Sequence, residues 1–210
     1  MDDKDIYKIV VLDNCCSGKT NLINRYVLNE YNNNEIPRLA QIYLEKSVEL
    51  NNGKKIIVQL WDTIGRDKYI YSDKKLTKGA KGLIFLYNIS NRNSFNEIKS
   101  YFYDIKQGIS DNVVLALVGN HLDVDDEDDN DNNYSCRKIT TNEGQNFAEE
   151  NNLLFYEVSA KDGTNVNEFF DELIQRIYEN IPNAENDNRI LNENNINLRN
   201  NRPAKRGCLK

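Results

Sequence analysis

Short apolar runs alternate with segments of helical spacing along most of this chain. The apolar runs lie at residues 6–12, 56–60, 83–87, 113–118 and 153–158. Each run is short enough for one strand, and runs that are apolar on both faces are typical of parallel strands buried between helices. Helical spacing recurs between the runs, as in the series Leu22, Ile23, Tyr26 and Val27. The alternation predicts an α/β fold that is doubly wound around one core.

One further strand is expected to run in the opposite direction. Residues 42–50 alternate loosely between apolar and polar, and Asn51, Asn52 and Gly53 then supply the positive φ angles of a tight hairpin turn. With this antiparallel strand we expect a mostly parallel sheet of six strands, with helices on both faces.

Two hydroxyl residues indicate helix starts. Ser94 is followed three residues later by Glu97, and Thr140 is followed by Glu143 at the same spacing. In this capping-box pattern the hydroxyl and the carboxylate satisfy backbone N–H groups of the first helical turn. We therefore expect helices to begin at Ser94 and at Thr140.

The composition indicates one acidic domain followed by a tail. The 210 residues suit a single domain of ordinary size, which we expect at residues 1–182, with an asparagine-rich tail at 183–210. The net charge of −6 argues against a nucleic-acid partner, because broad nucleic-acid binding needs a basic face. The sequence shows neither a signal peptide nor an apolar run of about 18 residues, so we expect a cytoplasmic protein.

A phosphate-binding loop is the first chemical candidate. Cys16, Ser17, Gly18, Lys19 and Thr20 follow the first expected strand and open a helical pattern. In this context backbone N–H groups and the helix N-terminus face phosphate, the lysine bridges the terminal phosphates, and the hydroxyl binds magnesium. The Gly-Lys-Thr tripeptide alone is weak evidence, because it also suits an ordinary helix start.

Three further motifs follow later strands in order. They are Trp61-Asp62-Thr63-Ile64-Gly65, Asn120-His121-Leu122-Asp123 and Ser159-Ala160-Lys161. Carboxyl ends of parallel strands meet at one edge of a sheet, so these loops should converge on one crevice. With the stretches VQLWDT, KGAKGLIFLYNIS and EGQNFAEENNLLFYEVSAKDGTNV, the chain resembles Ras-like small GTPases over residues 6–181, and the Rab branch most.

The resemblance implies the P-loop GTPase fold, with GTP or GDP and Mg²⁺ as ligands. It implies that Lys19 neutralises the β and γ phosphates, while Thr20 binds the ion directly and Asp62 holds it through water. The Gly65 amide would contact the γ-phosphate. These are the phosphate and metal roles that the family pattern assigns.

The resemblance also implies a base site. Asn120 and Asp123 would bind guanine, and the Ala160 amide, between Ser159 and Lys161, would meet the base oxygen. Two further positions stay open. Tyr31 either stacks on the base or is an ordinary loop residue. His121, where the family has lysine, either packs beside the base or is a surface loop residue.

Several positions depart from the family pattern. Asp13 stands at the first glycine of the phosphate loop and Cys16 at a middle glycine. Glycine allows close backbone approach, and a carboxylate pointing inward repels phosphate, so we expect weakened nucleotide affinity. Arg38 stands where the family has a magnesium-binding threonine, and it is either a solvated loop residue or a new γ-phosphate contact.

Slow hydrolysis of GTP is expected from the residue at position 66. Arg66 stands where the family has the glutamine that orients the attacking water, and positioning of that water is central to phosphoryl transfer. Lys19, Gly65 and Arg66 are the candidate catalytic positions.

Two polar segments are expected to lack regular structure. Residues 123–131 hold seven acids in nine positions, as part of an acid-rich insert at about 124–133, and residues 183–201 hold nine asparagines. The insert lacks the glycine and the spaced glutamate of a calcium-binding loop, which favours a solvated loop. The last twelve residues contain five basic residues and Cys208. Cys208 is either prenylated, as the resemblance implies, or unmodified.

The leading hypothesis is a divergent Rab-like guanine-nucleotide switch in vesicle trafficking. It would recruit effector and regulator proteins through residues 35–50 and 64–80, at the cytosolic face of an intracellular membrane. This trafficking role rests on the resemblance alone. The alternative is a pseudo-GTPase, a binding module that recruits partners without nucleotide cycling. A P-loop kinase or ATPase is disfavoured, because Asn120 and Asp123 specify guanine.

Overall fold

A six-stranded sheet forms the centre of the protein, in the strand order β2-β3-β1-β4-β5-β6. The computed structural model describes residues 6–13, 17–34, 42–63, 77–124 and 136–181. All neighbouring strands are parallel except the pair β2 and β3. The strands are β1 (Ile6–Asp13), β2 (Ile42–Glu49), β3 (Lys55–Asp62), β4 (Gly82–Asn88), β5 (Val114–Asn120) and β6 (Leu154–Glu157). The predicted α/β fold with one antiparallel strand is confirmed.

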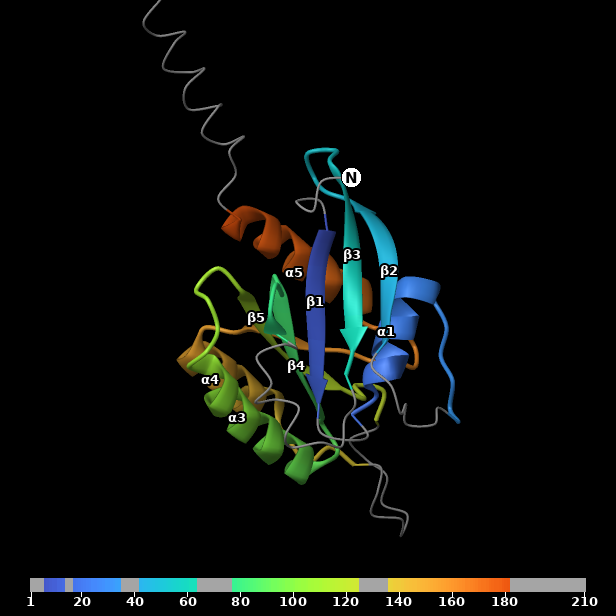
Figure 1. Cartoon of the computed structure of the whole chain (residues 1–210). Coiled ribbons are helices and arrows are strands. Elements are labelled where there is room, and N and C mark those ends of the chain that lie inside the picture. Colours follow the sequence, from blue (N-terminus) through green and yellow to red (C-terminus); the bar gives the residue numbers. More distant parts are fainter. Residues whose placement is uncertain (1–5, 14–16, 35–41, 64–76, 125–135, 182–210) are drawn as a thin grey trace, which may run out of the picture. The chain divides into compact units, whose positions relative to one another are not determined.

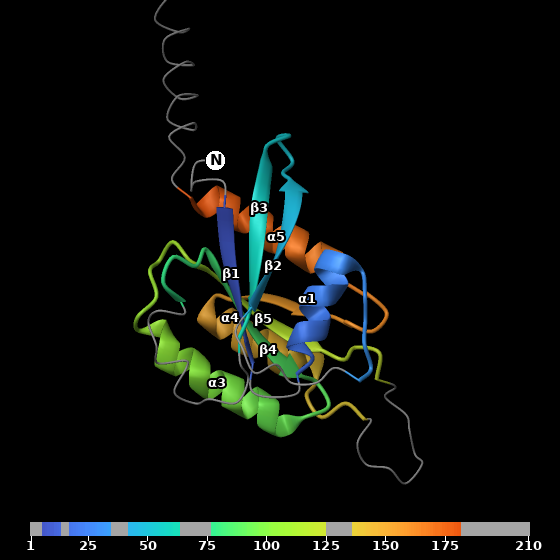
Figure 2. The ribbon, with the colours of Figure 1, turned by 45° about the vertical axis from the view of Figure 1, so that its right-hand side comes forward.

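Helices cover both faces of this sheet (Figures 1 and 2). The described helices are α1 (Lys19–Leu28), α3 (Arg92–Lys106), α4 (Thr141–Asn151) and α5 (Val166–Asn180). On one face, α3 and α4 pack on a cluster that includes Val10, Phe85 and Tyr87 from the strands. On the other face α1 and α5 pack together, and the rings of Tyr26 and Phe170 stack 4.0 Å apart. No helix among the described residues is long and apolar enough to cross a membrane.

The hairpin turn forms at the predicted position, but of Asn51, Asn52 and Gly53 only Gly53 has a positive φ angle. β2 and β3 pair up to Glu49 opposite Lys55, and Gly53 has a φ of 80°, which glycine adopts without steric cost. The Gly53 N–H donates to the Leu50 carbonyl at 2.8 Å and closes the turn.

One of the two expected helix starts is confirmed and the other is wrong. Thr140 is the N-cap of α4, where its side chain accepts from the Glu143 N–H. In contrast, α3 begins at Arg92, and Asn91 is its N-cap. Asparagine is a strong N-cap residue, and its side chain accepts from the N–H groups of Asn93 and Ser94. Ser94 lies inside the first turn instead, where its Oγ donates to the Asn91 carbonyl at 2.8 Å and accepts from the Asn88 N–H at 3.0 Å.

The strand ends place polar groups at one edge of the sheet. β1 ends at Asp13, β3 at Asp62 and β5 at Asn120. The neighbouring parallel strands keep these ends in register, with Val11 opposite Asp62 and Asn88 opposite Asn120. Most of the acid-rich insert and the asparagine-rich tail fall on residues 125–135 and 182–210, which lie outside the described residues, so their expected irregular structure and the domain boundary at 182 stay predictions.

Candidate functional site

Lys19 lies at the centre of a buried cluster of charges. Its Nζ atom is 3.0 Å from the Asp13 carboxylate and 3.1 Å from the Asp62 carboxylate. The Thr20 hydroxyl donates to the other oxygen of Asp62 at 2.7 Å. Lys19 is only 7% exposed, Asp13 2% and Asp62 4%. The structure therefore brings together the predicted phosphate and magnesium residues, and it adds Asp13 to them.

The cluster consists of one ammonium group and two carboxyl groups. Burial lowers the pKa of Lys19, but the attraction of Asp13 and Asp62 outweighs this effect, so its net pKa lies above the usual value. Lys19 is therefore charged at neutral pH. The pKa of Asp13 is raised, chiefly because burial disfavours its charged form, while the neighbouring Lys19 opposes that shift.

Gly18 links the phosphate loop to the base-binding motif. It precedes α1 with a φ of 80°, and an added Cβ would lie 2.4 Å from the Asn120 Nδ2 atom. This approach is far closer than real contacts allow, so the position requires glycine. The Asn120 amide group donates to the Ser17 carbonyl at 2.8 Å. It also accepts from the Ala160 N–H at 3.1 Å, so Asn120 joins the loops that follow β1 and β6.

Asp123 is held in place by the Ser159–Lys161 loop. The Ser159 hydroxyl donates to one carboxylate oxygen at 2.7 Å, and the Lys161 ammonium lies 3.4 Å from the other. Because both partners come from the loop after β6, this loop fixes the direction in which the carboxylate points. Such pre-organisation lowers the cost of binding a base there.

His121 is packed inside the site. It has a φ of 73°, and its Nε2 atom lies 3.5 Å from the position of a Cβ on Gly18. Burial lowers the pKa of His121, and Lys161 adds to this shift while Asp123 opposes it. Nε2 is buried without a hydrogen-bond partner among the described residues. The residue as a whole is half-buried and lies in a loop, so packing beside a base and an ordinary surface-loop position both stay predictions.

These residues surround a small hollow of about 20 Å³. Its lining consists of Gly18, Asn21, Tyr31, Asn120, His121, Asp123, Ala160 and Lys161. A hollow of this volume has room for about one water molecule, for which roughly 10–15 Å³ is needed, and a purine base is several times larger than that. A much larger concavity of about 680 Å³ lies beside Val114 and Leu154, where β5 and β6 begin, and it contains none of the predicted site residues.

Arg25 is a site residue that the sequence analysis missed. Its guanidinium donates from Nε to the Ala160 carbonyl at 2.9 Å and from Nη2 to the Lys161 carbonyl at 2.6 Å. Asn120 holds the N–H of Ala160 and Arg25 holds its carbonyl, so this loop is fixed from two sides. The sequence offers no specific signal for this role, because a basic residue in the last turn of a helix is common for dipole reasons alone.

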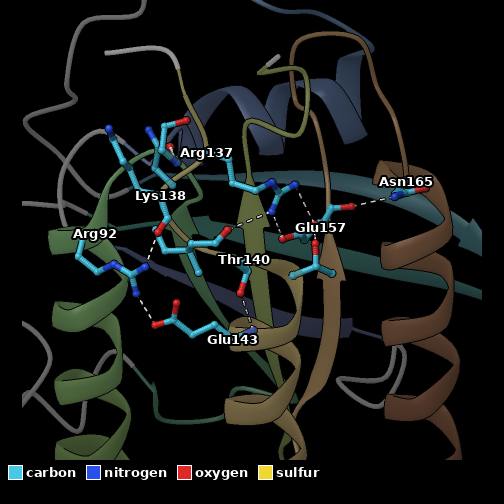
Figure 3. A network of polar contacts seen from close by, with 11 residues as sticks. Arg92, Arg137, Lys138, Thr140, Glu143, Glu157 and Asn165 are labelled. Atoms are coloured by element: carbon cyan, nitrogen blue, oxygen red, sulfur yellow. Dashed lines mark hydrogen bonds and ion pairs between the residues drawn. The ribbon is translucent and has the colours of Figure 1, made fainter. Parts of the chain in front are cut away.

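A network of polar contacts supports the end of β6 (Figure 3). Arg137 donates to both carboxylate oxygens of Glu157, at 2.7 and 3.1 Å, and the Thr141 hydroxyl also donates to that carboxylate. Asn165 donates to the Glu157 carbonyl at 2.8 Å. Arg92, on α3, contacts Glu143 and the Lys138 carbonyl. The network therefore ties α3, α4 and the start of α5 to the strand that leads into Ser159.

Several predicted site residues lie outside the described residues. They are Cys16, Arg38, Gly65, Arg66 and Cys208. Their proposed roles in phosphate contact, hydrolysis and lipidation stay predictions.

Comparison with known proteins identifies similar chains. The family model described as "Ras family" matches residues 8–179. The GTP-binding protein ypt3 of Schizosaccharomyces pombe is 32% identical over 178 residues, which cover 85% of this chain and 78% of that protein. The Ras-related protein Rab-11B of Dictyostelium discoideum is 34% identical over 171 residues, covering 81% and 73%. The Ras-related protein RabC of the same organism is 29% identical over 209 residues, covering 99% and 100%.

Proposed function

Because the chain belongs to the Ras family of small GTPases and is related to Rab proteins, we propose that it binds GTP and GDP with Mg²⁺ as a molecular switch. The convergence of Lys19, Thr20 and Asp62 with Asn120 and Asp123 at one edge of the sheet carries this proposal. The first three suit a phosphate with its metal ion, and the last two suit a base.

The base site fits guanine by its hydrogen-bonding groups. Asp123 keeps acceptor capacity beside its contacts with Ser159 and Lys161, because a carboxylate has about four lone-pair sites. A carboxylate accepts from the ring N–H and the exocyclic amine of guanine, whereas adenine lacks that pair of donors at this edge. Ser17 Oγ and His121 Nε2 are buried without hydrogen-bond partners among the described residues. Buried polar atoms are normally paired, so these two favour a polar ligand.

Thr20 and Asp62 fit a magnesium ion. Hydroxyl and carboxylate oxygens are the hard ligands that Mg²⁺ prefers, and the ion keeps several waters of its own. The two side chains lie 2.7 Å apart, so both can face one ion. When bound, the ion neutralises negative charge on the terminal phosphates. Thr20 would hold the ion directly, and Asp62 would hold it through one of its waters.

Hydrolysis of GTP is proposed to be slow. Arg66 has no carbonyl oxygen on its side chain, so it cannot accept a hydrogen bond from the attacking water and orient it as glutamine does. Arg38 cannot replace the hydroxyl ligand of the ion, because an arginine side chain has no acceptor atom.

An aromatic pair with one exposed ring supports a partner surface. Tyr43 on β2 is 45% exposed, and its ring stacks on Trp61 of β3 at 4.8 Å. The Lys8 ammonium lies over the Trp61 ring at 4.6 Å. Aromatic residues are enriched in the cores of protein interfaces. We therefore assign effector and regulator binding to the surface around Tyr43, within the expected range 35–50, together with residues 64–80.

The similarity to Rab proteins supports the proposed trafficking role and membrane site. We propose that the chain associates peripherally with the cytosolic face of an intracellular membrane through a lipid on Cys208, assisted by the basic end. One lipid chain binds a membrane reversibly, and a basic patch adds to its attraction.

Fractionation of cells that express Cys208→Ser tests this membrane anchor. If the variant pellets with membranes as fully as the parent, the anchor is wrong.

The decisive experiment identifies the nucleotide that purified protein releases on heat denaturation. We expect guanine nucleotide from the parent and a large loss of it from Asp123→Ala. Adenine nucleotide in the parent would contradict guanine recognition. No nucleotide in the parent, combined with no binding of added GDP, would favour the alternative of a pseudo-GTPase, for which the contact between Asp13 and Lys19 is the supporting observation.

A further inference from the structure

Lys19 already has a phosphate-like partner within the protein. The Asp13 carboxylate lies 3.0 Å from the Lys19 ammonium. A second carboxylate, that of Asp62, lies 3.1 Å from the same ammonium. Asp62 is shared with the Thr20 hydroxyl, which donates to it at 2.7 Å. A contact near 3 Å between an ammonium and a carboxylate is a charge-assisted hydrogen bond, which is roughly twice as strong as a neutral one.

The backbone of Asp13 is anchored in the sheet. Asp13 is the last residue of β1, which is paired with β3 on one side and with β4 on the other, and it lies opposite Leu86. Its backbone is therefore part of the sheet, and only rotation of its short side chain can move the carboxylate. The residue is 2% exposed, so water competes little for its charge.

The charges of this cluster oppose an incoming phosphate. One ammonium between two carboxylates leaves an excess of one negative charge when all three are ionised. A phosphate that reaches Lys19 must displace Asp13 or lie beside it. Both alternatives cost free energy, because like charges a few ångströms apart repel strongly where water is scarce. Base binding at Asn120 and Asp123 does not meet this cost.

We propose that Asp13 is a specificity-determining residue that takes the place of a phosphate at Lys19, so that the β and γ phosphates add little to nucleotide affinity. The inference rests on the proposed guanine-nucleotide binding and deepens it. The protein then recognises mainly the guanine nucleoside, and it discriminates weakly between guanosine monophosphate, diphosphate and triphosphate.

The test compares guanosine, GMP, GDP and GTP as ligands of the nucleotide-free, full-length protein. Calorimetry with Mg²⁺ present gives a dissociation constant for each ligand in the parent, Asp13→Asn and Asp13→Gly. We expect Asp13→Asn to bind GDP and GTP about tenfold to a hundredfold more tightly than the parent, which is the range for one charge-assisted hydrogen bond. Its affinities for guanosine and GMP should not change.

Asp13→Asn is the primary variant, because asparagine has the size of aspartate and should fold in its place. Asp13→Gly restores the glycine of the family pattern, and it should give an equal or larger gain. The matched control is Asp111→Asn, which removes one negative charge from an exposed residue at the distant 680 Å³ concavity. This control should bind all four ligands as the parent does.

Three results would overturn the inference. The first is an equal gain for GMP and GTP, which would indicate a general effect on folding. The second is unchanged GTP affinity in Asp13→Asn. The third is a loss of GTP affinity in Mg²⁺ but not in chelator, which would make Asp13 a ligand of the ion. The proposed function is tested separately, because guanosine and GMP binding by the parent does not depend on Asp13, and a parent that prefers adenosine would contradict that function alone.

Discussion

The site has a base end, with Asn120 and Asp123, and a phosphate end, with Lys19, Thr20 and Asp62. The two ends differ in the partners that hold their polar and charged side chains. At the base end, Asn120 accepts from Ala160 and donates to Ser17, and Asp123 is held by Ser159 and Lys161. Both Asn120 and Asp123 therefore have partners that fix the direction of their side chains. At the phosphate end, Lys19 lies between Asp13 and Asp62, so its charge is already compensated. One end is prepared for a ligand, and the other is occupied by the protein's own carboxylate.

This difference predicts that the proposed base binding and the proposed phosphate binding can be altered separately in this protein. β5 and β6 lead into the base loops, whereas β1 and β3 lead into the phosphate loops. Among the described residues, the Asn120 amide and the Arg25 guanidinium connect the two ends. A substitution at one end can therefore change one part of recognition while the other part is kept.

The largest expected effect is a change of base preference when Asp123 is substituted. Asp123→Asn should reverse the preference from guanine to xanthine nucleotide, because xanthine offers the reversed hydrogen-bond pattern at that edge. An unpaired buried donor or acceptor costs roughly 1 to 3 kcal/mol, so GDP affinity should fall about tenfold to a hundredfold. Competition between GDP and xanthosine diphosphate measures the reversal. Asp104→Asn, on the exposed side of α3, is the matched control. Equal affinity of the parent for ATP and GTP would remove the base-recognition claim.

The next effect concerns turnover at the phosphate end. Arg66→Gln combined with Arg38→Thr should raise the rate of GTP hydrolysis, because the two changes restore a water-positioning group and a ligand of the ion. Intrinsic hydrolysis in an intact family member is on the order of 10⁻⁴ per second, and the parent should be slower. A gain of about tenfold corresponds to 1.4 kcal/mol of transition-state stabilisation. Single-turnover hydrolysis of preloaded GTP measures it, and a parent rate at or above the family value would show that one of these arginines is catalytic.

Much of the fold could be predicted because its signals are local. Short apolar runs fix the strands, Asn51-Asn52-Gly53 fixes the hairpin, and Thr140 with Glu143 fixes the start of α4. The start of α3 was mispredicted because the side chain of Asn91, and not that of Ser94, caps the first helical turn. Asn91 lies three residues before Ser94 and accepts from its N–H, so the helix begins before the capping box that Ser94 suggests.

The site could be predicted only in part, because some contacts join distant segments. Lys19, Thr20, Asp62, Asn120 and Asp123 follow from motifs at strand ends. Sequence alone recognised Asp13 as a departure but not as the partner of Lys19. That contact depends on the side chain turning toward α1, which no local pattern specifies. Arg25 was missed because its partners, Ala160 and Lys161, are 135 and 136 residues away.

A smaller effect is expected from substitution of Arg25, which contacts the base end. Arg25→Leu removes the hydrogen bonds to the carbonyls of Ala160 and Lys161, so the base loop loses one of its two supports. We expect guanosine affinity to fall several-fold and the free energy of unfolding to fall by about 1 to 2 kcal/mol. The increment in affinity from GMP to GTP should not change. A structural weakening of the whole site, in contrast, would change that increment as well. Arg25→Lys should restore part of the guanosine affinity, and failure of both variants to alter it would contradict the positioning role.

The smallest effect is a pH dependence that originates at the base end. Burial lowers the pKa of His121, with Lys161 adding to the shift and Asp123 opposing it. In the unfolded chain the same side chain has a pKa of about 6.5. As the pH falls below that value, the unfolded chain takes up a proton that the folded chain resists, so the unfolded state is favoured. The stability linked to His121 is thus complete above the unfolded pKa and is lost as the pH falls through the lowered, folded pKa.

Urea unfolding of nucleotide-free protein at pH 7.5, 6.5 and 5.5 measures this effect. The free energy of unfolding should decrease less in His121→Gln than in the parent as the pH falls. Carboxylates that titrate in the same direction are common to both proteins and cancel in the difference. The affinity increment from GMP to GTP should be the same in both proteins, because His121 lies beside Gly18 and not beside the Lys19 cluster. Parallel stability curves would show that His121 titrates as it does in the unfolded chain, and its place in the hollow would then have no electrostatic consequence.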